Sequence, residues 1–166
     1  MFGVDEYVIY GSEGVCRVKA IGKVEISGLD PDKDYYTLVP FYRSGTIYTP
    51  TDSGIIMRSV ISKEYAQGLV SRISEISSKL DVPVNVKEAG LYYKQILRTY
   101  ECENLVRIIK YVFDKQRRLA ALKRNMPAIE IKYMKMAEDM LYGELGFVLG
   151  IPPKEVKDYI IEKNAV

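Results

Sequence analysis

The 166-residue sequence has no histidine and no tryptophan, and its only two cysteines, Cys16 and Cys102, lie in different halves. Without histidine, Ser–His and Cys–His nucleophile chemistry and the commonest general base are missing. A zinc site needs about four soft ligands, so we expect no metal site. There is no glycine loop of the nucleotide-binding type either. We therefore expect neither an enzyme nor a cofactor, and we expect both cysteines to be buried thiols.

Long apolar runs are also missing, since none approaches the roughly 20 residues of a membrane span. The start of the chain carries Asp5 and Glu6 where a secretory signal would carry basic residues. Apolar residues make up 48% and charged residues 28%, a composition typical of folded soluble proteins. The sequence therefore predicts a cytoplasmic protein with one ordinary domain or two small ones.

Charge differs between the two parts of the chain, although the net charge is only +2. Residues 1–62 hold six basic and eight acidic residues, whereas residues 63–166 hold eighteen basic and fourteen acidic. This asymmetry suggests that the two parts face different partners.

The first part has the pattern of short β-strands. Residues 15–21 alternate apolar and polar side chains, which is the period of a half-buried strand, and residues 7–10 are β-branched and aromatic. Turn residues fill 11–14, 29–34 and 44–45. We expect strands over 7–10, 15–21, 35–42, 46–50 and 55–61. Strands this short and closely spaced predict a small, strongly bent sheet or barrel.

Two of these strands carry a proline, Pro40 and Pro50. Proline cannot donate to a strand ladder, so we expect both strands at a sheet edge. Such an edge can accept a partner strand, or the prolines can simply protect it against aggregation.

The second part has the apolar spacing of helices. Ser62 and Asn85 are expected N-caps, and Gly150 is an expected helix end. We expect helices over 62–80, 86–99, 103–125 and 127–149, and a short one after the two prolines at 152–153. In the third and fourth helices the predicted inner stripes include Leu122 and Ile131. The predicted fold is α+β, with a β module over 1–61 and a bundle of about five helices over 62–166.

The third predicted helix is strongly basic. Only Asp114 opposes seven basic residues between 107 and 124: Arg107, Lys110, Lys115, Arg117, Arg118, Lys123 and Arg124. Such a face attracts phosphates, and it is also compatible with a solvated helix that binds nothing.

A second feature lies in the preceding helix, where Tyr92 and Tyr93 stand beside Lys94 and Arg98. An aromatic ring next to basic residues can stack on a base or wedge into a groove. Alternatively, Tyr93 belongs to the core and Tyr92 is merely partly exposed.

An ordered series of short motifs resembles the CarD/CdnL family, whose front module is shared with the transcription-repair coupling factor. DEYVIY at 5–10 resembles the opening GD-VVYP strand of that family, and GVCRV at 14–18 resembles its HG-G-V hairpin. IYTP at 47–50 resembles its V-VP strand, and MRSVI at 57–61 its LRPV exit. Further on, Tyr93, Lys94 and Leu97 resemble a YK--L pattern.

The resemblance implies a bacterial transcription regulator whose front module is a Tudor-like, SH3-like β barrel. That barrel would bind the RNA polymerase β subunit by strand addition and side-chain contacts. The residues placed at this interface are Lys23, Val24, Arg43, Ile47, Tyr48, Thr49 and Pro50. The helical module would contact promoter DNA at the upstream edge of the melted region and stabilise the open complex.

The residues that the resemblance places at DNA are Ala89, Tyr92, Lys94, Arg98, Lys115, Arg117 and Arg118. The chain departs from the family pattern because the tryptophan that wedges DNA is absent, with Ala89 near its position and Tyr92 as a substitute. The alternative function is an adaptor that binds RNA polymerase without touching DNA. We expect a monomer, although an exposed edge strand also permits a domain-swapped dimer.

Overall fold

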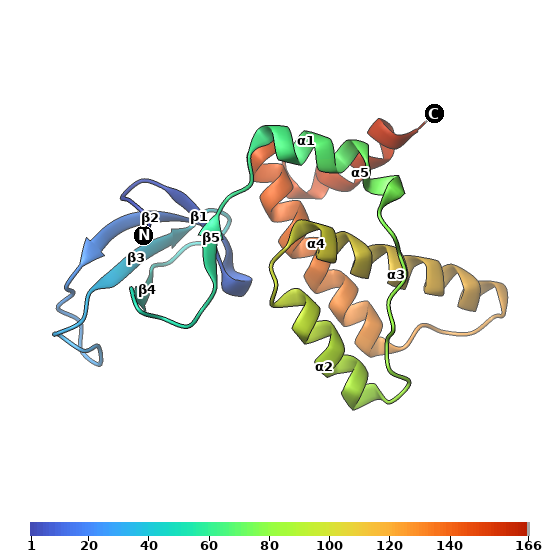
Figure 1. Cartoon of the computed structure of the whole chain (residues 1–166), viewed down its shortest axis with the longest axis horizontal. Coiled ribbons are helices and arrows are strands. Elements are labelled where there is room, and N and C mark those ends of the chain that lie inside the picture. The colour runs from blue at the N-terminus through green and yellow to red at the C-terminus, as the bar shows by residue number, and fades with distance from the viewer. Residues whose placement is uncertain (166) are drawn as a thin grey trace. The chain divides into compact units, whose positions relative to one another are not determined.

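The computed structural model describes residues 1–165 and divides into two compact units, Met1–Ile61 and the residues from Ser62 onward. Figure 1 shows that strands make up the first unit and helices the second. The protein therefore has the predicted α+β composition.

Within residues 1–61, five strands form one antiparallel sheet in the order β4-β3-β2-β1-β5. Their bounds are β1 Tyr7–Tyr10, β2 Gly14–Gly22, β3 Tyr35–Pro40, β4 Ile47–Pro50 and β5 Met57–Ser59. A short 3-10 turn, Gly11–Glu13, joins β1 to β2, and this connection confirms the hairpin expected there. Gly14 has φ 77°, a left-handed conformation that glycine adopts without strain.

One face of the sheet carries the core of this unit. Its buried members alternate along the strands, as half-buried strands require, and they are Val8, Tyr10, Cys16, Val18, Tyr36 and Leu38. Phe2, Ile47 and Met57 pack against this cluster. Cys16 and Cys102 are both buried thiols, as predicted.

The sheet is open, so the predicted barrel is not closed. The edge strands β4 and β5 pair only with β3 and β1, respectively, within residues 1–61. Closing a barrel requires every strand to pair on both sides. Here the segment between the edge strands turns on itself instead: the Ser53 amide donates to the Pro50 carbonyl at 3.0 Å, and the Ile55 amide donates to the Ser53 hydroxyl at 3.1 Å.

Pro50 lies on an edge strand as predicted, but Pro40 does not, because β3 is internal. Phe41 donates its amide to the Val15 carbonyl at 2.8 Å, so the Pro40 nitrogen points away from β2. On that side β4 pairs only with residues Tyr35 to Leu38. An internal strand therefore tolerates this proline because the ladder has already ended where an N–H would be needed.

Within residues 62–165, five α-helices form the second unit. Their bounds are α1 Lys63–Ser71, α2 Val86–Leu97, α3 Cys102–Ala121, α4 Ala128–Leu149 and α5 Pro153–Asn164. The Ser62 hydroxyl accepts from the Tyr65 amide, and Asn85 Oδ1 accepts from the amides of Lys87 and Glu88. Gly150, at φ 72°, ends α4. These caps confirm the predicted helix boundaries at 62, 85 and 150.

The first helix is much shorter than predicted, because it ends at Ser71 and a 3-10 turn, Ile73–Glu75, follows it. The Lys110 ammonium of α3 donates to the carbonyls of Ile73, Ser74 and Ile76, which a continuing helix would have used itself. From Ile76 to Asn85 the chain is not helical. We refer to residues 76–85 as the crossing segment.

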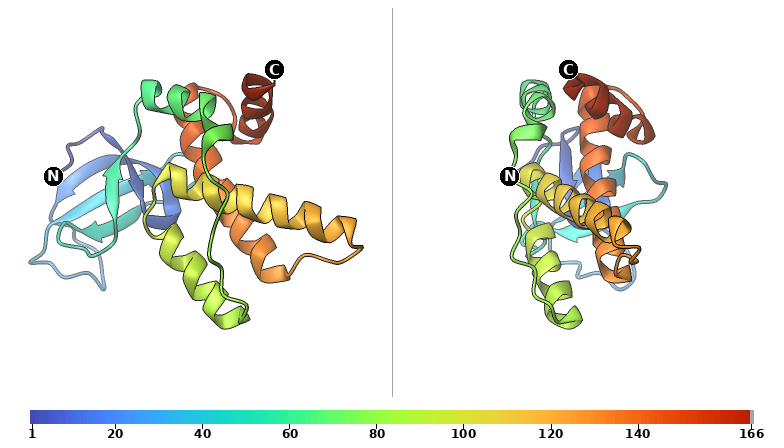
Figure 2. Two further views of the ribbon diagram at one scale, coloured as in Figure 1. Left: turned by 45° about the vertical axis from the view of Figure 1, so that its right-hand side comes forward. Right: turned by 90° about the vertical axis from the view of Figure 1, so that its right-hand side faces the viewer.

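Helix α4 is the centre of this unit and packs against each of the other helices. Figure 2 shows it crossing α3. Two residues of the predicted inner stripes are wrong, since Leu122 is 65% exposed and Ile131 is 51% exposed. Leu122 lies just beyond the end of α3, where no helix covers it. No helix within residues 1–165 has the length and apolarity needed to cross a membrane.

Candidate functional site

The β4 edge of the sheet is the first candidate interface. The Thr51 amide donates to the Asp34 carbonyl at 3.0 Å, in the same register as the pairs Tyr36–Thr49 and Leu38–Ile47. Because hydrogen-bonding direction alternates along an antiparallel strand, the backbones of Tyr48 and Pro50 point outward. Tyr48 offers both an N–H and a carbonyl to a partner strand, whereas Pro50 has no N–H and its carbonyl already accepts from the Ser53 amide.

The β5 edge is less open to a partner. It has only three residues, and the Arg58 guanidinium donates to the Ser59 carbonyl at 3.0 Å. The Gly11 amide donates to the Ile56 carbonyl at 3.0 Å, which by the same alternation turns the Ser59 backbone outward. Arg58 therefore covers an acceptor that a new strand would need, and β4 is the more accessible edge.

The residues predicted to bind the polymerase do not all behave alike. Tyr48 is 37% exposed, Ile47 and Pro50 are partly buried, and Thr49 is only 3% exposed. The Thr49 side chain therefore points inward, and its part in polymerase binding stays a prediction.

The two predicted cations of this surface are separated. Lys23 follows β2, at the end of the sheet where Gly22 pairs with Tyr35 and Tyr35 with Pro50. Its ammonium donates to the Asp32 carbonyl at 2.7 Å, and Val24 beside it is partly buried. Arg43 follows the opposite end of β3 and forms an ion pair with Glu13. A partner along β4 would therefore meet Lys23 and Arg43 at opposite ends of the edge.

The basic side chains of the first half of α3 bind within the helical unit. Arg107 donates to the Lys79 carbonyl at 3.0 Å, and Lys110 holds the carbonyls described above. Lys115 forms a 2.8 Å ion pair with Glu130, whose side chain is 4% exposed. The predicted contact of Lys115 with DNA stays a prediction, and the ion pair with a buried carboxylate counts against it.

The second half of α3 and the turn after it have a different character. Arg117, Arg118, Lys123 and Arg124 are all exposed. Arg117 lies over the Phe113 ring, 5.9 Å from its centroid, and Arg118 makes no hydrogen bond or ion pair with the described residues. These four residues, here called the α3 basic end, are the part of the predicted basic run that is available to an anion.

Beneath this surface, the ion pair of Lys115 and Glu130 adjoins two stacked rings. Tyr93 is fully buried, and its ring centroid lies 5.2 Å from that of Tyr133. Burial, and next the nearby charge of Glu130, raise the pKa of Tyr93 far above that of a free tyrosine. Tyr93 is therefore a neutral core residue, as the alternative reading of its sequence predicted.

Of the residues predicted at DNA on α2, Lys94 and Arg98 are exposed, whereas Ala89 is only 4% exposed. Ala89 lies in the packed face of the helix, which counts against the predicted DNA contact at this position. Tyr92 is partly buried, and its hydroxyl accepts from the Asp81 amide at 3.2 Å, so it holds the crossing segment.

Leu91 adjoins the aromatic and basic residues noted on α2 but was not among the predicted DNA contacts, and 53% of it is accessible. It shares a helix face with Lys94 and Arg98 because the spacing is i, i+3 and i+7. That spacing could have added it to the predicted contacts. Leu91, Lys94 and Arg98 form what we call the α2 stripe.

No group of three or more cysteine, aspartate or glutamate side chains within residues 1–165 could hold a metal ion.

Comparison with known families bears on the first unit. Residues 2–61 match the family model of the CarD-like/TRCF RID domain. The N-terminal unit therefore belongs to this family of RNA polymerase-interacting domains, which confirms the resemblance of its motifs. The family match ends where the helical unit begins. A search of curated proteins found no match to the chain.

Proposed function

We propose that this chain, whose N-terminal unit belongs to the CarD-like/TRCF RID family, is a transcription regulator that binds the RNA polymerase β subunit and contacts promoter DNA. The observation that carries the proposal is the combination of the family match over residues 2–61 with the open β4 edge. The outward N–H and carbonyl of Tyr48 can pair with a partner strand there without any change in the fold.

The helical unit is the proposed DNA-contacting part, acting near the upstream edge of the melted region. The α3 basic end supplies charge for phosphates, and the α2 stripe combines two cations with an exposed leucine. Apolar side chains of this kind can insert between base steps and favour a distorted duplex. Stabilising an open complex requires only that these contacts be stronger in the open state than in the closed one.

A second candidate function is an adaptor that binds RNA polymerase without touching DNA. It is favoured by the first half of α3, where Arg107, Lys110 and Lys115 are bonded within the unit. Fewer cations are therefore free for phosphates than the sequence suggests. The absence of tryptophan also removes the strongest wedge residue from the chain.

Polymerase binding is tested by proline at the β4 edge of the full chain. Tyr48→Pro removes an outward N–H and leaves the bonds between β3 and β4 in place. We expect it to weaken retention of the β subunit in a pull-down by about tenfold, whereas Tyr48→Ala, which keeps the N–H, should weaken it less.

The matched control is Ser59→Pro, which places the same change on the outward backbone of the other edge strand. It should leave polymerase retention unchanged. Thermal unfolding should show that both proline variants remain folded. Equal retention by Tyr48→Pro and the wild type would rule out strand addition at β4.

DNA contact is tested by the salt dependence of binding to a duplex that contains an unpaired bubble. If phosphates are neutralised, log K falls linearly with log salt concentration, and Arg98→Gln should reduce that slope by about 1. Lys154→Gln, which removes an exposed cation from α5, should change it less. Affinity that does not depend on salt, with polymerase binding intact, would favour the adaptor.

A further inference from the structure

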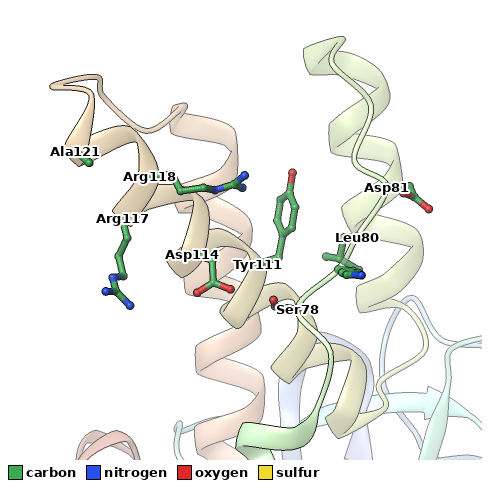
Figure 3. A pocket seen from close by; sticks show the side chains of 9 residues that line it. Ser78, Leu80, Asp81, Tyr111, Asp114, Arg117, Arg118 and Ala121 are labelled. Atoms are coloured by element: carbon green, nitrogen blue, oxygen red, sulfur yellow. The ribbon is translucent and has the colours of Figure 1, made fainter.

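A hollow between α3 and the crossing segment lies outside the family match, and only two of its lining residues, Arg117 and Arg118, are among the predicted DNA contacts. Its volume is about 770 Å³, within the range of small-molecule sites. Ser78, Lys79, Leu80 and Asp81 form one wall, and Tyr111, Asp114, Arg117, Arg118 and Ala121 form the other. Figure 3 shows this arrangement from close by.

The wall formed by the crossing segment is held in place from two helices. From α3, Arg107 donates to the Lys79 carbonyl at 3.0 Å and Lys110 donates to the Ile76 carbonyl. From α2, the Tyr92 hydroxyl accepts from the Asp81 amide at 3.2 Å. The hollow is therefore bounded by anchored backbone, and the basic residues of the first half of α3 build it.

The side chains of the opposite wall are available to a ligand. In Figure 3, the Arg118 side chain reaches toward Tyr111. Asp114 lies on α3 between Arg117 and Tyr111, and the Arg117 side chain points away from Tyr111. Arg118, Asp114 and the Tyr111 hydroxyl make no hydrogen bond or ion pair within residues 1–165. A guanidinium, a carboxylate and an aromatic ring thus stand around one hollow without partners of their own.

This combination selects the chemistry of the ligand. A simple phosphate would gain from Arg118 but would be repelled by Asp114. A ligand that also carries N–H donors can satisfy the carboxylate, and a flat ring can stack on Tyr111 or pack against Leu80. A nucleotide of adenine, cytosine or guanine provides all of these features, because a phosphate is joined to a ring whose exocyclic amine donates hydrogen bonds.

We infer that this hollow binds an unpaired nucleotide of a single DNA strand, with the phosphate at Arg118 and the base between Tyr111 and Leu80. The inference rests on the proposed contact with promoter DNA and deepens it, because melting is what supplies an unpaired base. A base held here cannot return to the duplex, which gives the protein a higher affinity for the melted state.

Fluorescence anisotropy on the full chain tests the inference with labelled single strands of dA, dC, dG or dT and with duplex of the same length. Single strands should bind more tightly than duplex. Tyr111→Ala and Arg118→Gln should each weaken single-strand binding by about tenfold, with a smaller effect on duplex. Tyr111→Phe keeps the ring and should bind single strands like the wild type. Thermal unfolding should show that Tyr111→Ala remains folded.

Asp114 provides the test of base recognition. It should favour strands whose bases carry an exocyclic amine, dA, dC and dG, over dT, and Asp114→Asn should reduce that preference. Lys154→Gln is the control for loss of charge alone. Equal effects of Arg118→Gln and Lys154→Gln, or no effect of Tyr111→Ala, would overturn the inference.

Further outcomes distinguish a free nucleotide from a DNA strand as the ligand, and they distinguish failure of the hollow from failure of the proposed DNA contact. A free nucleoside monophosphate that binds more tightly than any oligonucleotide would overturn the assignment to a DNA strand. Duplex binding that persists while single strands bind no better would remove the hollow from the mechanism and leave DNA contact intact. If the wild-type chain binds neither single strands nor duplex, the proposed DNA contact itself is contradicted.

Discussion

The two halves of α3 carry similar positive charge and use it in opposite ways. In the first half, Arg107, Lys110 and Lys115 donate to backbone carbonyls and to a buried carboxylate. In the second half, Arg117 and Arg118 are exposed and have no acidic partner among the described residues. The difference shows that the availability of each cation in a basic run depends on whether the packed chain places an acceptor beside it. Counting charges in the sequence cannot reveal this.

The largest effect on this comparison is expected from Lys115→Met. It leaves the Glu130 carboxylate buried without a partner, so we expect a loss of about 3 kcal/mol in the free energy of unfolding. Urea unfolding followed by circular dichroism measures it. Arg118→Met is the matched control in the second half and should stay within about 0.5 kcal/mol of the wild type.

The same pair offers a rescue. Replacing both partners, Lys115→Met with Glu130→Leu, should recover most of the lost stability, because an apolar pair avoids the uncompensated charge. Equal stability of Lys115→Met and Arg118→Met would remove the distinction between the two halves of the helix.

An intermediate effect is expected from Lys110→Met, which takes away the donor to the carbonyls of Ile73, Ser74 and Ile76. Leaving such acceptors unsatisfied costs about 1–3 kcal/mol where they are buried. Hydrogen exchange read by mass spectrometry should show faster exchange over residues 73–85 than in α4. Unchanged protection in that segment would show that Lys110 does not hold it.

A smaller effect is expected from Tyr92→Phe, which keeps the ring but loses the acceptor for the Asp81 amide, with a loss of about 0.5–1.5 kcal/mol. The lifetime of the open complex in the presence of RNA polymerase distinguishes an anchor from a wedge. If the ring wedges DNA, Tyr92→Ala shortens the lifetime and Tyr92→Phe does not, while polymerase binding stays constant. Parallel losses of polymerase binding and open-complex lifetime in Tyr92→Ala would contradict a wedge.

The smallest effect on folding is expected from Arg117→Gln, within about 0.5 kcal/mol of the wild type. Its consequence should appear in DNA binding, where the slope of log K against log salt concentration should fall by about 1. An unchanged slope would show that the α3 basic end does not meet phosphates.

Local chemistry made much of the fold predictable. Ser62, Asn85 and Gly150 mark helix boundaries because a side-chain cap or a left-handed glycine acts within one turn. The alternating residues of β2 identify a half-buried strand because successive side chains point to opposite faces of a sheet. The end of α1 at Ser71 was not predictable, because it depends on Lys110, which lies 37 residues beyond Ile73.

The candidate site also has features that local sequence predicts and features that depend on tertiary structure. The edge position of Pro50 followed from a proline in a short strand, whereas the inward position of Thr49 depends on the register with Tyr36. The exposure of Leu91 could not be derived from its apolar character, because it depends on how the helices pack.

The sequence by itself determined the α+β order of elements, the family of the first unit and the excess of positive charge in the second, because these depend on composition, short motifs and local periodicity. Only the tertiary structure decided which strands are edges, that the barrel stays open, and which cations of α3 remain available. Those outcomes depend on pairings between distant residues, since each donor is used by whichever acceptor the packed chain brings within reach.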